Sequence, residues 1–168
     1  MRSLPIALAV SLAVLSISTS LQGQRAASPV DPRSMQLLAQ GRAARAAGNL
    51  DAAVDAFETA VAVDPRNRAA FVALGDTAEA RGLPGKAIRF YREALTLEPN
   101  DIAALAGQGE ALVSKGAVNR ARDNLARIRT LCKAGCGEAT QLAAAIAKGP
   151  PVATAQAATT VPPAPTRE

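Results

Sequence analysis

The sequence predicts an all-α protein, a solenoid of three helical hairpins followed by a C-terminal capping helix. Two observations lead to this fold class. Glycines recur at an interval of 34 residues, in the series Gly41, Gly75 and Gly109 and in the series Gly48, Gly82 and Gly116. Within each unit, apolar residues return every three or four positions, the spacing of one helix face. A fixed period of this length is typical of stacked hairpins that share a core.

The central unit, residues 68–101, shows how each hairpin is built. Phe71, Leu74 and Ala78 lie on one face of its first expected helix. Gly82 suits the left-handed residue that ends a helix, and Pro84 suits the first turn of the next one. Related units are expected at about residues 34–67 and 102–135, and a capping helix at 138–148.

The motif of the central unit resembles the tetratricopeptide repeat family, over roughly residues 34–133. The family pattern is a large apolar residue, Leu-Gly, a mid-size residue, Ala, an aromatic, Ala and Pro. The matching residues are Phe71, Leu74, Gly75, Ala78, Ala87, Tyr91, Ala94 and Pro99. The third unit departs from the pattern at Gln108, Ile128 and Lys133. The resemblance implies a right-handed solenoid, with the motif residues serving as core packing and not as site residues.

The resemblance also implies a concave groove lined by the first helix of each hairpin. The groove positions carried over are Met35, Leu38, Arg42, Arg45, Ala69, Val72, Asp76, Glu79, Ala103, Ala106, Glu110 and Val113. Such a groove has a basic end and an acidic end over an apolar floor, and a peptide or helix of a partner would lie in it. In a simpler interpretation, Arg42 and Arg45 pair with Asp76 and Glu79, and both interpretations can hold together.

The family's carboxylate clamp for chaperone C-termini is absent. It is built from Lys, Asn and Arg, whereas the corresponding positions here include Leu38, Ala73, Ala103 and Gly107. Binding of chaperone tails is therefore not implied.

The N-terminal residues 1–20 have the layout of a secretory signal peptide. Arg2 precedes an apolar run from Leu4 to Ile17, and small residues follow it. The run is short for a membrane span, which needs about 20 residues. We expect an exported protein, periplasmic or secreted, with no stable membrane span; an uncleaved anchor is the alternative.

Two segments lack helical periodicity. Residues 21–33 are expected to be a linker. Residues 149–168 are rich in Pro, Ala and Thr and have too few large apolar residues to offset the entropy of ordering. A disordered tail is the expectation there, and a tether to a neighbouring component is the alternative.

Composition argues against several functions. The chain has 19 basic and 14 acidic residues, interspersed along the sequence, whereas nucleic-acid binders usually cluster their basic residues on one face. It contains no His, the commonest general base and metal ligand. We therefore expect no enzyme activity, no cofactor, no metal site and no nucleic-acid partner.

Cys132 and Cys136 are the only cysteines. In an exported protein they should be oxidised, and a separation of one helical turn places their Cα atoms about 6 Å apart, within disulfide reach. A structural clip between the last repeat and the capping helix is expected. A catalytic dithiol is the alternative, although the spacing differs from the redox Cys-x-x-Cys.

Three functions follow from these expectations, in descending order. The first is an exported protein-interaction scaffold that binds a partner in the groove. The second is a self-associating structural component of an envelope assembly, a homo-oligomer built through the weakly matched end repeat. The third, an envelope enzyme or glycan-handling protein, has no support beyond its compartment.

Overall fold

The computed structural model describes residues 29–132 and 135–151. These residues form seven helices and no strand. The helices are α1 (Pro32–Ala46), α2 (Leu50–Val63), α3 (Arg68–Ala80), α4 (Pro84–Leu97), α5 (Ile102–Ser114), α6 (Val118–Leu131) and α7 (Gly137–Lys148). The predicted signal peptide and nearly all of the predicted tail lie outside the described residues.

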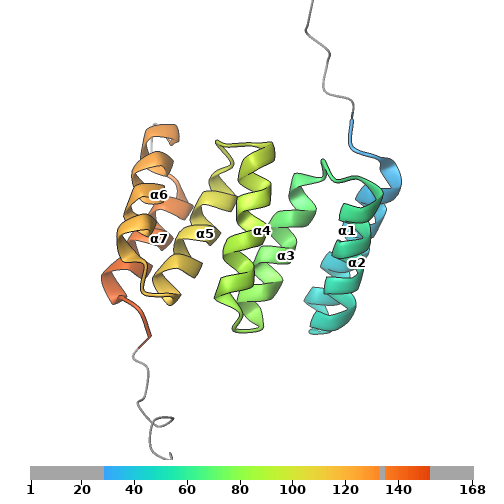
Figure 1. Cartoon of the computed structure of the whole chain (residues 1–168), viewed down its shortest axis with the longest axis horizontal. Helices are drawn as coiled ribbons and strands as arrows, with labels where there is room; N and C mark the ends of the chain where they lie inside the picture. The colour runs from blue at the N-terminus through green and yellow to red at the C-terminus, as the bar shows by residue number, and fades with distance from the viewer. Residues whose placement is uncertain (1–28, 133–134, 152–168) are drawn as a thin grey trace, which may run out of the picture.

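The helices pair into three hairpins that stand side by side in one row, and α7 follows at the end (Figure 1). Each first helix contacts the first helix of the next hairpin: α1 packs on α3, and α3 packs on α5. Helix α7 packs on α5 and α6, in the place that the first helix of a fourth hairpin would take. The predicted all-α solenoid of hairpins is confirmed.

A left-handed glycine closes the first helix of every hairpin. Gly48, Gly82 and Gly116 have φ angles of 78°, 69° and 77°, which a residue with a Cβ adopts only with strain. The amide of the residue after each glycine donates to a carbonyl in the preceding helix, as Leu83 does to Ala78 over 2.8 Å. The predicted turns therefore follow from the backbone freedom of one residue in each repeat.

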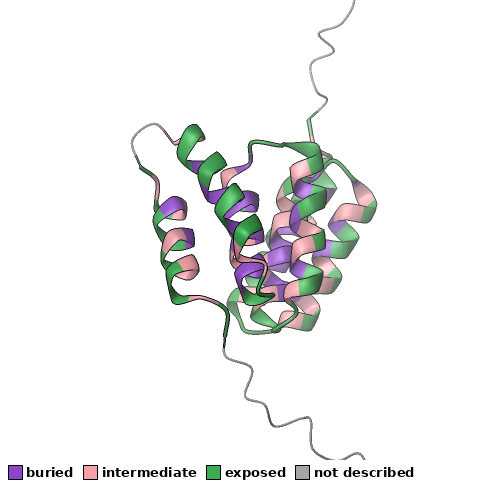
Figure 2. Cartoon of the chain, turned by 60° about the vertical axis from the view of Figure 1, so that its left-hand side comes forward, coloured by how far each residue is buried: buried purple, intermediate pink, exposed green. Residues whose placement is uncertain are grey.

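The core lies where the hairpins meet, and buried faces point toward neighbouring helices along the whole row (Figure 2). A Cβ added at Gly41 would lie 2.4 Å from the ring of Phe57, and one at Gly75 would lie 2.5 Å from the ring of Tyr91. These glycines let an aromatic ring of the second helix lie against the first. At Gly109, the third glycine of this series, the nearest side chain is Leu142 of α7, at 2.6 Å from an added Cβ.

Helix α1 begins two residues earlier than the expected start of the first repeat. Asp31 is its N-cap and accepts a hydrogen bond from the amide of Arg33 at 2.7 Å, and Pro32 is its first residue. Because proline is well suited to the first turn of a helix, the last two residues of the predicted linker are helical.

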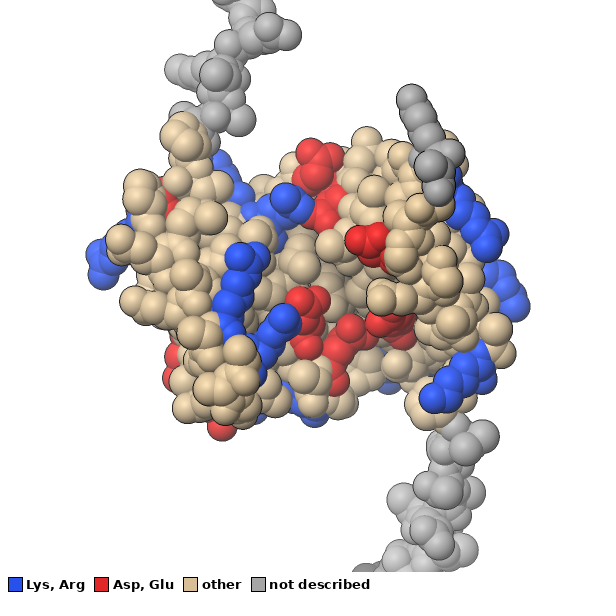
Figure 3. Space-filling view, turned by 180° about the vertical axis from the view of Figure 1, so that it is seen from behind, with Lys and Arg blue, Asp and Glu red and all other residues tan. Residues whose placement is uncertain are grey.

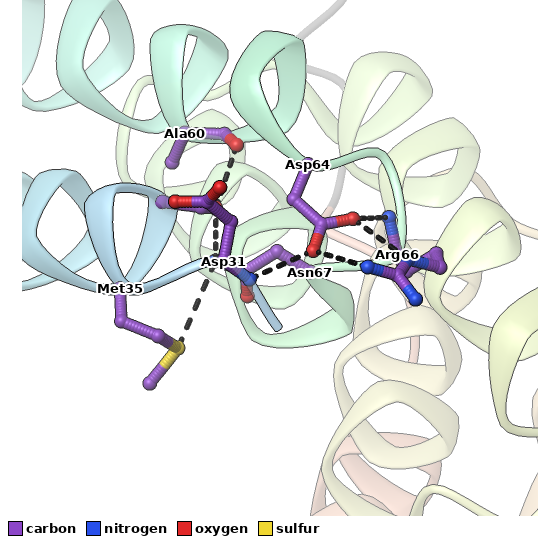
Figure 4. A network of polar contacts seen from close by, with 7 residues as sticks. Asp31, Met35, Ala60, Asp64, Arg66 and Asn67 are labelled. Atoms are coloured by element: carbon purple, nitrogen blue, oxygen red, sulfur yellow. Dashed lines mark hydrogen bonds and ion pairs between the residues drawn. The ribbon is translucent and has the colours of Figure 1, made fainter. Parts of the chain in front are cut away.

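A polar network joins the first two hairpins (Figure 4). Asn67 caps α3 by accepting from the amide of Ala70 at 3.2 Å, and its amide group donates to the Ser34 hydroxyl at 2.7 Å. Ser34 in turn donates to the carbonyl of Ala60 at 2.7 Å. The loop is held by the same network, since Asp64 accepts from the amide of Asp31 at 2.9 Å and pairs with Arg66. The buried polar groups at this junction therefore bond across the hairpins.

A disulfide links the end of α6 to the start of α7. Cys132 and Cys136 are bonded, with their Cα atoms 5.9 Å apart. Leu142 is fully buried beneath α7, whereas Ile146 on the same face is only partly buried. The covalent link and the Leu142 contact together hold α7 against the last hairpin.

Candidate peptide-binding groove

The first helices α1, α3 and α5 present their free faces to one side of the row, and α7 continues this side. On α3, Val72, Asp76 and Glu79 are spaced to share one face, and all three are partly exposed. Figure 3 shows this side of the molecule, with acidic side chains gathered around its hollow and basic side chains on both sides of them.

One part of the hollow has a volume of about 710 Å³. Glu79 of α3 and Glu110 and Val113 of α5 line it, and Ala145 and Lys148 of α7 close the far side. The rim beyond α7 consists of Gly149, Pro150 and Pro151. This part of the groove is large enough for a few side chains of a bound segment.

Leu38 does not line the groove. Its side chain is 1% exposed and packs in the core with Phe57 and Leu74. The groove position predicted for Leu38 is wrong because the side chain lies on the flank of α1 that faces α2 and α3. Met35 and Arg42 of α1 remain exposed.

One ion pair links a basic residue of the groove to an acidic one. Arg45 donates to Asp76 Oδ2 at 2.9 Å, between the first two hairpins. Glu79 does not pair with Arg42: within the described residues, Arg42 forms no ion pair, and Glu79 contacts Tyr91 instead. The predicted charge pairing therefore holds for one arginine of the two.

Tyr91 of α4 reaches the groove from behind. Its ring is buried, and its hydroxyl oxygen lies 2.9 Å from Asp76 Oδ1 and 3.1 Å from Glu79 Oε2. A Cβ at Gly107 would lie 2.4 Å from the ring and 2.6 Å from the hydroxyl oxygen. The Tyr91 hydroxyl therefore reaches the groove between α3 and α5 only because Gly107 has no side chain.

The environment favours protonated Glu79. Burial, against the hydrogen bond from Tyr91 and together with the nearby charges of Glu110 and Asp76, raises the pKa of Glu79 to about 7. Burial, then the charge of Asp76, also raises the pKa of Glu110. The Tyr91 hydroxyl has one proton, so it can bond to both carboxyl groups at once only if one of them is protonated and donates to it. Its raised pKa makes Glu79 the carboxyl group that binds this additional proton more readily than an ordinary glutamate does.

The role of Tyr91 is missing from the sequence prediction, which assigns it to core packing alone. The ring does pack in the core, but the hydroxyl belongs to the groove. One signal was present: the equivalent positions of the other repeats hold Phe57 and Leu125, so only this repeat adds a polar atom, close in the fold to Asp76 and Glu79.

Within residues 29–132 and 135–151, no group of three or more Cys, His, Asp or Glu residues is arranged to hold a metal ion. None of the helices in these ranges is long and apolar enough to cross a membrane.

A family model described as tetratricopeptide repeat matches residues 38–102. Residues 38–102 are thus similar to the tetratricopeptide repeat family. This match covers the first two hairpins, and the solved structures extend the similarity to the third. No curated protein matches the sequence.

Several solved structures share the fold. The Sgt2 domain from Aspergillus fumigatus is 20% identical, with a TM-score of 0.66, covering 75% of this chain and 83% of that one. The first such domain of Spaghetti (RPAP3), bound to an HSP90 peptide SRMEEVD, is 19% identical with a TM-score of 0.64, covering 69% and 91%. The Thermobaculum terrenum O-GlcNAc transferase mutant K341M is 24% identical with a TM-score of 0.62, but only 22% of that chain is covered against 68% of this one. At these identities the similarity shows the fold alone.

Proposed function

We propose that this protein is an exported scaffold of the tetratricopeptide repeat family that binds a segment of a partner protein in its groove. The observation that carries the proposal is the hollow side of the solenoid, which combines an apolar floor with charges of both signs. Apolar contact supplies binding free energy, and the charges set the orientation of the segment. The domain bound to an HSP90 peptide has the same fold, which supports a peptide as the ligand. Export rests on the sequence pattern of residues 1–20.

The groove assignment can be tested with charge reversal at an arginine that the fold does not use. Arg42→Glu is suitable because Arg42 forms no ion pair within the described residues, whereas Arg45 holds Asp76. Arg89→Glu, at an exposed position of α4, is the matched control. The immobilised full chain would capture partners from an envelope extract of the source organism. We expect Arg42→Glu to lose a partner that both the unchanged chain and the control retain.

A second measurement locates the contact. A photo-crosslinking residue at Val72 of α3 lies on the groove side, and one at Glu93 lies at an exposed position of α4. Adducts with the captured partner should form from position 72 and not from position 93. Adducts from position 93 alone would place binding elsewhere and contradict the groove assignment.

Self-association is a second candidate, favoured by a hollow of about 410 Å³ between α6 and α7. Leu125, Ala143 and Ile146 give it apolar walls at the end of the row. Light scattering of the full chain tests this function. Oligomers that Ile146→Glu dissociates would support it, and a monomer at every workable concentration would exclude it.

A further inference from the structure

We propose that the segment bound in the groove is held by a Lys or Arg side chain between Glu79 and Glu110, and by an acidic side chain at Arg42. This inference rests on the proposed function, because it names the chemistry of the segment that the groove takes. The acidic site and Arg42 lie on different helices, so the two contacts together also define a spacing along the segment.

Two of the three carboxylates in the groove lack a cationic partner. The charge of Asp76 is offset by Arg45 at 2.9 Å. Within the described residues, Glu79 and Glu110 form no ion pair, and Lys148, which lines the same hollow, is not within ion-pair distance of either. A ligand cation in the hollow would therefore meet two carboxyl groups that no cation of the described residues already pairs with.

The walls around Glu79 and Glu110 suit a long aliphatic side chain that ends in a charge. Val113 and Ala145 line the hollow beside the two carboxylates. Lysine and arginine bury their methylene stems against apolar surface while the charged group reaches a polar partner. The arrangement thus matches a basic side chain in both shape and charge.

The titration of Glu79 and Glu110 is consistent with this assignment. Both carboxyl groups have a raised pKa because burial and neighbouring carboxylates disfavour their ionised forms. A cation placed between them would favour ionisation and reverse the effect of the mutual repulsion. In the unoccupied groove these carboxyl groups therefore bind a proton more readily than ordinary carboxyl groups, and a ligand cation would lower their pKa.

Arg42 supplies the second contact. It lies on α1, is exposed and has no ion pair within the described residues. Neighbouring packed helices are about 8–10 Å apart, and an extended chain advances about 3.3 Å per residue. A segment that crosses the helices would therefore carry its acidic residue about three residues from the basic one if that residue meets α3, and about six if it meets α5.

The experiment is a selection of short random peptides, displayed on phage, against the immobilised full chain. Selected peptides are then synthesised, and their affinities are measured for the unchanged chain, for Glu79→Gln/Glu110→Gln and for Arg42→Gln. Glu93→Gln, at an exposed position of α4, is the control. We expect the selected peptides to share a Lys or Arg at one of the two predicted spacings from an Asp or Glu. The double variant should weaken binding about tenfold or more, and the control should not.

The outcomes separate this inference from the proposed function. Peptides that cross-link to position 72 but lack a basic residue, or that bind the double variant unchanged, would overturn the inference and leave the groove as a binding site. A selection that yields no peptide, or only peptides that cross-link away from position 72, would contradict both. Replacement of the basic residue by norleucine provides the reciprocal check: it should cost as much affinity as the double variant, and the two losses should not add.

Discussion

At the scale of single residues, Tyr91 connects the hydrophobic core to the groove. Its ring lies against Gly75 and Gly107 on two different hairpins, and its hydroxyl contacts Asp76 and Glu79. A rigid aromatic side chain can hold a polar atom at a fixed place only if its ring is enclosed. The glycines therefore determine where the groove's carboxyl groups find their hydroxyl partner.

Gly107→Ala tests this enclosure. Alanine normally favours a helix over glycine by about 1 kcal/mol, but the added Cβ would lie 2.4 Å from the buried ring of Tyr91. We expect a net loss of about 1–2 kcal/mol in the free energy of unfolding, since overpacking outweighs the gain in helix propensity. Urea denaturation measures the change.

Gly85→Ala is the control for this substitution. Gly85 is also helical, in α4, and nothing lies within 4 Å of an added Cβ. The control should be neutral or slightly stabilising. If Gly107→Ala were equally well tolerated, the tight contact with Tyr91 would not constrain this position.

Glu79 predicts a pH dependence of stability. Its pKa is about 7 in the folded chain against an ordinary value of 4.5, so the folded state binds the proton more tightly than the unfolded state. The contribution is fully present below pH 4.5 and is lost as the pH rises to about 7. Glu79→Gln should remove this loss, so the variant gains stability relative to the unchanged chain as the pH rises from 4.5 to 7.

Thermal unfolding across this pH range makes the comparison. Glu58→Gln, which changes an exposed carboxylate of α2 outside the groove, is the control and should follow the profile of the unchanged chain. Parallel profiles for Glu79→Gln and the unchanged chain would show that Glu79 titrates at the same pH in both folded and unfolded states.

At the scale of helices and their junctions, a polar residue can act in two elements at once. Asn67 caps α3 and also bonds to Ser34 of α1, and both groups are buried. Asn49, by contrast, caps α2 from an exposed position with a single hydrogen bond to the amide of Ala52. The same residue type therefore contributes differently at the two helix starts.

Asn67→Ala should destabilise the protein by about 2–3 kcal/mol, because the cap is lost and the buried Ser34 hydroxyl loses a partner. Asn49→Ala should cost only about 1 kcal/mol, the usual value for a cap alone. Guanidinium denaturation of both variants tests the difference. Equal losses would mean that the bond to Ser34 contributes nothing measurable.

The sequence predicts the helices well because their signals are local. A glycine that must be left-handed acts through its own backbone and recurs every 34 residues. A proline in the first turn of a helix, as at Pro84, acts in the same local way. The floor of the groove is harder to predict. Leu38 and Met35 are both apolar residues of α1, yet one is buried and the other 46% exposed, because the neighbouring hairpin covers only one flank of the helix.

The Tyr91 contact was unpredictable for the same reason. It depends on three helices, α3, α4 and α5, and on the absence of a side chain at Gly107. Residue spacing within one repeat identifies the position of the aromatic ring, but it does not identify the partners of the hydroxyl group.

At the scale of the whole molecule, the solenoid is a row of neighbours in which each hairpin contacts only the next. The last contact of the row, between α5 and α7, is made by Leu142, which is fully buried and packs against Gly109. In such an array, a loss at one end affects nearby units more than distant ones.

Leu142→Ala should therefore act locally. We expect a loss of about 2–5 kcal/mol in the stability of the last hairpin, the usual cost of such a cavity. Hydrogen exchange should rise in α5, α6 and α7, and much less in α1 and α2. Leu97→Ala, at a position that is 41% exposed, is the control and should change little. A uniform rise over all helices would show that the domain unfolds as one unit.

Helix α7 also sets the length of the segment that the groove can contact. It occupies the place of a further first helix, so α1, α3, α5 and α7 offer three intervals of about 8–10 Å each. An extended segment covers that span with about seven to nine residues. A partner bound here would be shielded from proteases over a stretch of that length, while residues on either side of it stay open to cleavage. The length of the protected fragment would therefore report how many of these helices the bound segment crosses.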